Sequence, residues 1–259
     1  MDIVYIIGKQ KSDADNFELR CSLRSIAKYG INVDNVFIVG YVPDFVSDKV
    51  IGIPFEQPYP GDTCDEKSAN IMASVVRAAM DPRVGNHFLV SSDDHFYTDY
   101  TDFDNYPIHL RKYTWGTGKN RTQLPDTHSD ELPEYTKFLV DSCLRLKERN
   151  LPTYNFTLHR NMHIWKDVIF DNINDVTNMI KTCKPVEMFV YIGNAALNKG
   201  KIQLCDCKTV VDKKLINGVI EWWKTNSEYG VFSTPNFEKG SCLHILLKGR
   251  YPDKCKYEK

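Results

Sequence analysis

Two adjacent carboxylates, Asp93 and Asp94, follow an apolar run in the stretch FLVSSDDHFYTDY, residues 88–100. Like charges side by side repel, so exposure, hydrogen bonds or a cation must compensate for this pair. Mg²⁺ and Mn²⁺ bind one or two carboxylates and fill their remaining positions with water and phosphate oxygens. Such a cation would act as a Lewis acid toward a departing nucleotide diphosphate. On the motif alone, a solvated Asp–Asp turn that caps a helix is the alternative.

Histidines near this pair are candidates for proton transfer or metal binding. His95 follows the carboxylates directly and could contact an acceptor. His159 and His163 stand four apart in LHRNMHIW, a spacing that would place both on one metal-binding face of a helix. Because the segment follows Pro152 and has no helix start signal, we expect a loop leading into a strand, which separates the two imidazoles.

Basic side chains near the predicted end of the first strand could bind phosphate. Arg20 and Arg24 lie four apart on one helix face, where a guanidinium can grip a diphosphate with two hydrogen bonds. A solvated helix charge is the alternative for each. Gly8 and Lys9 end that strand, where a nucleotide could sit, although a glycine there also forms an ordinary turn.

A basic and aromatic stretch lies between residues 109 and 121, HLRKYTWGTGKNR. This composition suits phosphate binding and the stacking of bases or sugars. A solvated mobile loop is the alternative, and the stretch is the only local indication of a nucleic-acid acceptor. Its candidate contacts are Arg111, Lys112, Trp115, Lys119 and Arg121.

The elements that must position these residues alternate between strands and helices. Apolar runs predict strands at 3–8, 35–40 and 87–92, with a short strand at 49–53. Amphipathic helices are predicted at 16–30 and from 65 to Pro82. This order indicates a Rossmann-like, mostly parallel sheet with helices on both faces, in which ligands bind beyond the carboxyl ends of the strands.

The pattern is looser after residue 100, and we expect one domain over 1–259. We divide it into a first part, 1–105, and a second part, 106–259, which includes a helical C-terminal part. We predict a long mobile loop at 107–130, helices near 131–150 and 166–183, and a helix capped by Asp212. The tail YPDKCKYEK is predicted to be exposed.

Composition excludes several classes of protein. With 42% hydrophobic and 26% charged residues, the chain is typical of a soluble globular protein. A net charge of −1 gives no overall attraction to nucleic acid or membrane, and no apolar run is long enough for a membrane span. Asp2 argues against a signal peptide, so we read the eight cysteines, including Cys205 and Cys207, as reduced thiols of a cytoplasmic protein.

Two parts of the chain resemble known families. SSDDHFY after an apolar strand is similar to the DXD-type motif of GT-A-fold glycosyltransferases. NFELRCSLRSIAKYG followed by NVFIVGYVPDFV resembles the first part of the Stealth family of sugar-phosphate transferases and small glycosyltransferase-like proteins of bacteriophages. The resemblance covers about residues 1–100.

The resemblance implies a metal-dependent glycosyltransferase with a nucleotide-sugar donor, with UDP as the expected nucleotide. It also implies that residues 1–105 bind the nucleotide sugar and that residues 106–259 form the acceptor side and the C-terminal half. Asp93 and Asp94 would hold Mn²⁺ or Mg²⁺, and His159 would serve as a further ligand or as general base. Asp94, His95, Asp99 and His159 are the candidates for a base. The acceptor would be a glycan, another hydroxyl compound or a hydroxylated base in phage DNA, in the host cytoplasm if a phage encodes the protein. A Stealth-type sugar-1-phosphate transferase and a non-catalytic nucleotide- or sugar-binding module are the alternatives.

Overall fold

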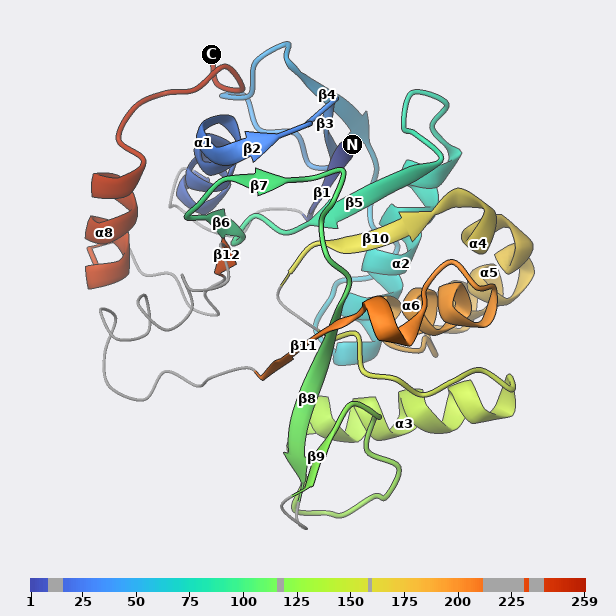
Figure 1. The fold of residues 1–259 in the computed structure, drawn as a ribbon. Helices are drawn as coiled ribbons and strands as arrows, with labels where there is room; N and C mark the ends of the chain where they lie inside the picture. Colours follow the sequence, from blue (N-terminus) through green and yellow to red (C-terminus); the bar gives the residue numbers. More distant parts are fainter. Residues whose placement is uncertain (9–15, 116–118, 158–159, 212–230, 233–239) are drawn as a thin grey trace.

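A five-stranded sheet in the order β10–β5–β1–β3–β4 lies at the centre of the molecule (Figure 1). The structure is a computed structural model that describes residues 1–259 except 9–15, 116–118, 158–159, 212–230 and 233–239. Strands β1, β3, β4 and β5 run parallel, and β10 is antiparallel to β5. This confirms the predicted α/β class with a mostly parallel sheet. The strands are Asp2–Ile7 (β1), Val36–Gly40 (β3), Val50–Pro54 (β4), His87–Ser91 (β5) and Met162–Trp165 (β10).

Both faces of this sheet are apolar because each is covered by a helix. Ile3 and Tyr5 of β1 pack with Leu23 of α1 (Phe17–Tyr29), whereas Val4 packs with Val75 of α2 (Cys64–Met80). Successive residues of a strand point to opposite faces, so the two helices lie on opposite sides. α2 begins with the capping box of Thr63 and Glu66.

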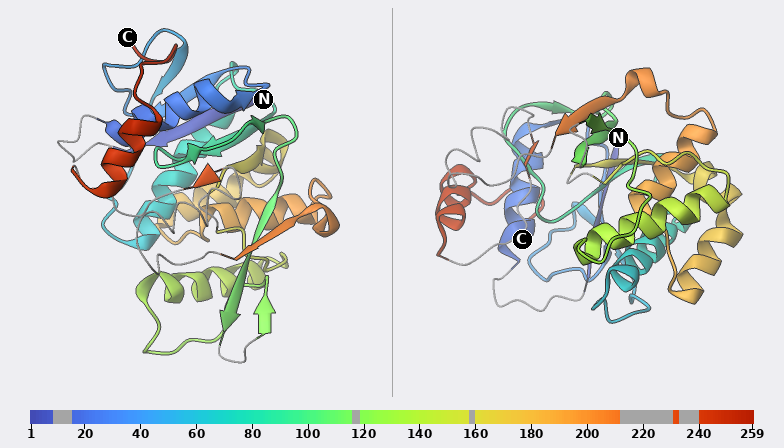
Figure 2. Two further views of the ribbon diagram at one scale, coloured as in Figure 1. Left: turned by 60° about the vertical axis from the view of Figure 1, so that its left-hand side comes forward. Right: turned by 90° about the horizontal axis from the view of Figure 1, so that it is seen from below.

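The second half of the chain adds helices to both sides. Four of the described helices join α2 on its side of the sheet, and α8 lies beside α1 (Figure 2). The single helix predicted for 166–183 is two helices that meet at Asn172. None of the helices that the structure describes is long and apolar enough to span a membrane. The added helices are Glu134–Glu148 (α3), Lys166–Asp171 (α4), Ile173–Thr182 (α5), Met188–Asn198 (α6) and Cys242–Arg250 (α8).

The loop predicted at 107–130 is wrong, because this segment contains the hairpin of β8 (His109–Trp115) and β9 (Lys119–Arg121). β11 (Lys208–Val211) pairs with β8 in parallel, so residues far along the chain satisfy its backbone hydrogen bonds. Leu110 is buried in the same core as α2. Shorter pairs join β2 (Gly30–Ile31) to β7 (Thr101–Asp102) and β6 (Phe96–Tyr97) to β12 (Val231–Phe232), and a 3₁₀ turn spans Leu204–Asp206.

The predicted exposure of the tail is confirmed only in part, because Pro252–Lys254, Lys256 and Lys259 are exposed while other tail residues pack against the body of the protein. Tyr257 and Glu258 are buried, with relative exposures of 4% and 8%. Ser47 donates its backbone N–H to the Tyr257 carbonyl (2.9 Å) and its hydroxyl to the Lys256 carbonyl (2.7 Å). Lys259 donates its N–H to the Phe45 carbonyl at 2.8 Å. The helix predicted from Asp212 lies outside the described residues.

Candidate active site

The carboxyl ends of β1 and β5 form the edge at which a ligand is expected. From β1 the chain adds β3 and β4 on one side and then crosses to place β5 on the other side of β1. The strand order therefore reverses between β1 and β5, and open parallel sheets bind ligands at such a reversal. Gly8 follows β1, and Asp93 and Asp94 follow β5, so the structure brings these predicted residues to one edge.

The two carboxylates occupy a turn after β5. The turn is closed by a hydrogen bond from the His95 N–H to the Ser92 carbonyl at 3.2 Å. The Ser92 hydroxyl donates to Asp93 Oδ1 at 3.2 Å. Burial, and then the charge of Asp94, raise the pKa of Asp93 despite this hydrogen bond. The side chains of Asp93 and Asp94 are partly exposed, so they combine access to solvent with closely spaced negative charge.

Glu18 is a third carboxylate at this edge, and the sequence reasoning missed it. It lies in the first turn of α1, the helix that follows β1. Burial, followed by the charges of Asp93 and Asp94, raises the pKa of Glu18 to about 7. The signal for it was present, because Glu18 stands inside the matched stretch NFELRCSLRSIAKYG and at the predicted helix start.

The chemistry of this cluster suits a hard divalent cation. Carboxylate oxygens are the ligands that Mg²⁺ and Mn²⁺ prefer. Burial, and then neighbouring negative charge, raise the pKa of Glu18 and of Asp93, and a cation at this edge would favour their charged forms. Across the described ranges, no three His, Cys, Asp or Glu side chains stand close enough to form a complete metal site. Asp93 and Asp94 could therefore hold such an ion only with water or a ligand's oxygens. His159, the other predicted ligand, lies outside the described residues.

His95 supports the turn from inside the protein. Its side chain is 4% exposed, and its Nδ1 lies 3.1 Å from Asn161 Oδ1 and 3.3 Å from Ser91 Oγ. Asn161 Oδ1 also accepts a hydrogen bond from the Tyr97 hydroxyl at 2.7 Å. This placement differs from the predicted contact between His95 and an acceptor, because burial removes the imidazole from the surface. Asn161, on the segment leading into β10, was missed since no sequence pattern links it to residues 91–97.

Arg20 and Arg24 form ion pairs with the tail. Arg24 donates from Nε to Glu258 Oε2 at 2.7 Å and from Nη2 to Glu258 Oε1 at 2.9 Å. Arg20 donates to Glu258 Oε1 at 3.1 Å, and its guanidinium lies 3.8 Å from the centre of the Phe45 ring. The diphosphate grip stays a prediction, and the ion pair with the tail is a contact that a helix pattern cannot reveal.

Gly8 and Arg111, two further predicted site residues, lie in different parts of the fold. A Cβ on Gly8 would come within 3.2 Å of Gln57 Oε1, so this amide lies against the end of β1. Lys9 lies outside the described residues. Arg111 donates from Nη1 to the Thr157 carbonyl at 3.3 Å, beside the segment that leads to β10.

Lys112, Trp115, Lys119 and Arg121 belong to the β8–β9 hairpin. Trp115 is the partner of Lys119 in the ladder, and Tyr113 is the partner of Arg121. The hairpin therefore brings the basic and aromatic positions of residues 109–121 onto paired strands rather than onto a loop.

Comparisons with known proteins give only distant likenesses. No family model matches the chain, and no curated protein matches it. One similar solved structure is the galactosyltransferase LgtC in complex with donor and acceptor sugar analogues. It has a TM-score of 0.42 and 11% identity, over 81% of this chain and 73% of that chain. An active-site mutant of LgtC has a TM-score of 0.47 and 10% identity, over 99% and 98% of the two chains. Both TM-scores lie below 0.5, so any functional assignment rests on the residues of this chain.

Proposed function

We propose that this protein is a divalent-metal-dependent glycosyltransferase that moves a sugar from a nucleotide-sugar donor to an acceptor hydroxyl. The observation that carries the proposal is the convergence of Glu18, Asp93 and Asp94 at the edge where β1 and β5 diverge. A sheet edge of this kind suits a nucleotide, and paired carboxylates suit a cation that binds its diphosphate. The resemblance of SSDDHFY to a DXD-type motif agrees with this chemistry.

Each carboxylate has a distinct part in this proposal. Asp93 and Asp94 would hold Mn²⁺ or Mg²⁺, which would neutralise the diphosphate leaving group as a Lewis acid. Glu18 adds negative charge next to them and strengthens the attraction for the cation. The buried network of His95, Tyr97 and Asn161 fixes the turn that carries Asp93 and Asp94.

The donor and acceptor are proposed from the family resemblance and from the basic residues of the β8–β9 hairpin. We propose UDP as the nucleotide from the family resemblance, and a glycan or other hydroxyl compound as the acceptor. A hydroxylated DNA base is a narrower form of this proposal, in which the β8–β9 hairpin with Lys112 and Arg121 would approach the nucleic acid. A sugar-1-phosphate transferase would use the same donor but break the bond between the two phosphates.

A thermal-shift screen of UDP-sugars with and without Mn²⁺ tests the proposal. A selective donor should raise the melting temperature only in the presence of the ion, because ligand binding to the native state stabilises it. Asp94→Asn should abolish the metal-dependent shift and turnover, whereas Asp130→Asn, at an exposed position outside the site, should leave both unchanged. Full turnover by Asp94→Asn in the presence of a chelator would contradict the proposal. Release of UDP indicates sugar transfer, and release of UMP indicates sugar-phosphate transfer.

A further inference from the structure

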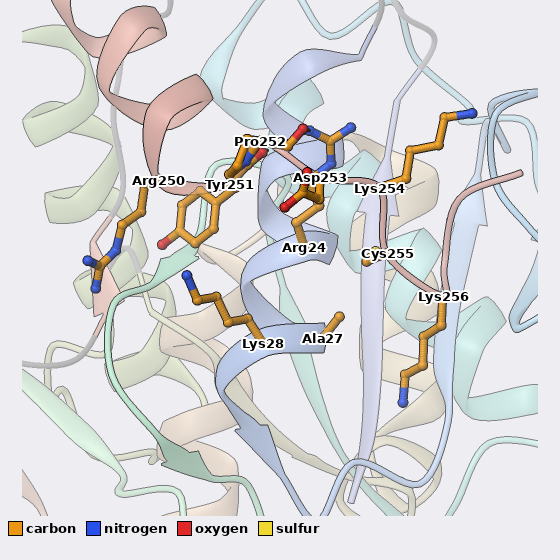
Figure 3. A pocket seen from close by; sticks show the side chains of 10 residues that line it. All are labelled: Arg24, Ala27, Lys28, Arg250, Tyr251, Pro252, Asp253, Lys254, Cys255 and Lys256. Carbon is orange, nitrogen blue, oxygen red and sulfur yellow. Dashed lines mark hydrogen bonds between the residues drawn. The ribbon is translucent and has the colours of Figure 1, made fainter.

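A pocket of about 440 Å³ lies between α1 and the segment that follows α8 (Figure 3). None of the candidate active-site carboxylates lines it. Its wall carries a single carboxylate, Asp253, against five cationic side chains, and we call it the basic pocket. The cations are Arg24 and Lys28 of α1, Arg250 at the end of α8, and Lys254 and Lys256 of the tail.

Three of these cations form no ion pair with any carboxylate that the structure describes. Arg24 is paired with Glu258. In the described part of the chain, no carboxylate forms an ion pair with Lys28, Arg250 or Lys256. Each of these three positions therefore retains a full charge on the wall of the pocket.

Two of these cations lie near one tyrosine ring. Arg250 donates from Nη2 to the Thr98 carbonyl at 2.9 Å, which fixes its guanidinium without neutralising it. The Arg250 guanidinium and the Lys28 ammonium lie 5.5 and 5.3 Å from the centre of the Tyr29 ring. An anion in the pocket would be attracted by both cations.

We propose that the basic pocket binds a soluble compact polyanion that carries two or more phosphate groups. The volume falls within the range of small-molecule sites, and Arg and Lys form charge-assisted hydrogen bonds with phosphate oxygens. A membrane surface is the weaker match, because Ile245 is the only exposed large apolar side chain of α8, a helix that the structure describes in full. The net charge of −1 likewise gives no broad attraction to nucleic acid. This inference is independent of the proposed transferase activity.

Titration calorimetry with pyrophosphate in the presence of a chelator tests this site. The wild type should bind, and the paired reversals Lys28→Glu and Lys256→Glu should weaken binding at least about tenfold, since each removes a charge-assisted contact. Lys181→Glu with Lys248→Glu is the matched control, because it makes the same change in net charge at exposed positions outside the pocket. The control should alter the affinity by less than about twofold. Absence of binding by the wild type, or equal weakening by both pairs, would overturn the proposal.

Two further measurements separate this pocket from the active site and from other partners. Asp94→Asn should bind pyrophosphate as the wild type does, and loss of binding in that variant would place the anion at the active site and overturn the proposal. Lys28→Gln with Lys256→Gln, which keeps the side chains long, should reproduce the loss if the reversed pair does not fold. Unchanged pyrophosphate binding by the Gln pair would contradict the proposal that the basic pocket binds the anion. If the reversals weaken binding only to phosphatidylserine vesicles or duplex DNA, the soluble-polyanion proposal fails.

Discussion

Arg24 and Glu258 stand 234 residues apart and form a two-point ion pair, with N–O distances of 2.7 and 2.9 Å. The Glu258 side chain is fully buried, and the Arg24 side chain is 14% exposed. Arg24 also donates to the Tyr251 carbonyl at 2.8 Å, so one guanidinium holds both ends of the segment 251–258. The first helix and the tail are thus one structural unit.

Replacing Glu258 with Gln should destabilise the protein. The change leaves Arg20 and Arg24 without their counterion at a largely buried position, and losing one partner of such a pair costs about 3 kcal/mol. The free energy of unfolding, measured by urea denaturation, should fall by this amount. Glu131→Gln, at an exposed position with no ion pair among the described residues, is the matched control. Equal stability of the two variants would show that the pair contributes little.

Glu18→Gln should stabilise the metal-free protein at alkaline pH. The pKa of Glu18 is about 7 in the native state against an ordinary value of 4.5, so native stability falls as the pH rises between these values. The variant should gain about 1 kcal/mol at pH 8, because it removes a charge that burial and then Asp93 and Asp94 disfavour and that solvent partly screens, and nothing at pH 4. Added Mn²⁺ should remove the advantage by stabilising the wild type more. A variant less stable than the wild type at pH 8 would show that the Glu18 charge does not destabilise the metal-free protein.

The free energy of unfolding should decrease as the pH is lowered from 6.5 to 4, because buried histidines resist protonation. His163 donates from Nε2 to the Tyr106 carbonyl at 2.8 Å, and its Nδ1 lies 2.9 Å from His87 Nε2. Burial, and then the neighbouring His87, lower the pKa of His163 from 6.5 to about 4. The unfolded chain therefore binds a proton in this window that the native state excludes.

His163 should contribute about 3 kcal/mol, because its pKa falls from 6.5 to about 4 and each pKa unit corresponds to 1.36 kcal/mol. His163→Gln keeps a donor to the Tyr106 carbonyl and should make the pH dependence shallower, as measured by denaturation at pH 7 and 4.5. Burial lowers the pKa of His87 and of His109 as well, the latter to about 3, so some dependence should remain in the variant. An unchanged slope would show that His163 does not titrate in this way.

Asn161→Ala should weaken both the fold and the candidate site. The change leaves the buried Tyr97 hydroxyl without its Asn161 acceptor and removes one of the contacts of His95 Nδ1, which costs about 2 kcal/mol. In the double variant with Tyr97→Phe the loss should be less than the sum of the single losses, since both groups of one hydrogen bond are then absent. If the proposed function holds, Asn161→Ala should also weaken the Mn²⁺-dependent binding of the donor. If the two losses add strictly, the hydrogen bond between Tyr97 and Asn161 contributes no measurable interaction energy.

The central sheet could be predicted from sequence because its signals are local. Strands that are apolar on both faces, such as β1 and β3, are the mark of a parallel sheet covered on both sides, and α1 and α2 carry apolar faces of helical period. The position of Asp93 and Asp94 followed from the end of one strand. Their position near the end of β1 could also be predicted, because the carboxyl ends of parallel strands lie at one edge of the sheet.

The remainder depended on contacts between distant parts of the chain. β8 is polar, and it is a strand because β11 pairs with it. Glu18 joins the site only because α1 begins at the edge where β5 ends, and Asn161 joins through the antiparallel pairing of β10 with β5. Arg20 and Arg24 have the spacing of a phosphate grip, and the buried Glu258 could not be foreseen from their helix.

The pairing of the tail with α1 also sets an order of events during synthesis. A ribosome makes Arg24 in α1 well before Glu258, which lies 234 residues further along, and domains fold as units once their contacts exist. Until Glu258 emerges, Arg20 and Arg24 lack this buried carboxylate, and the β3–β4 loop lacks the strand-like contact between Val46 and Glu258. The part of the nascent chain that carries α1 and the β3–β4 loop should therefore remain sensitive to protease until residues 251–258 have left the ribosome.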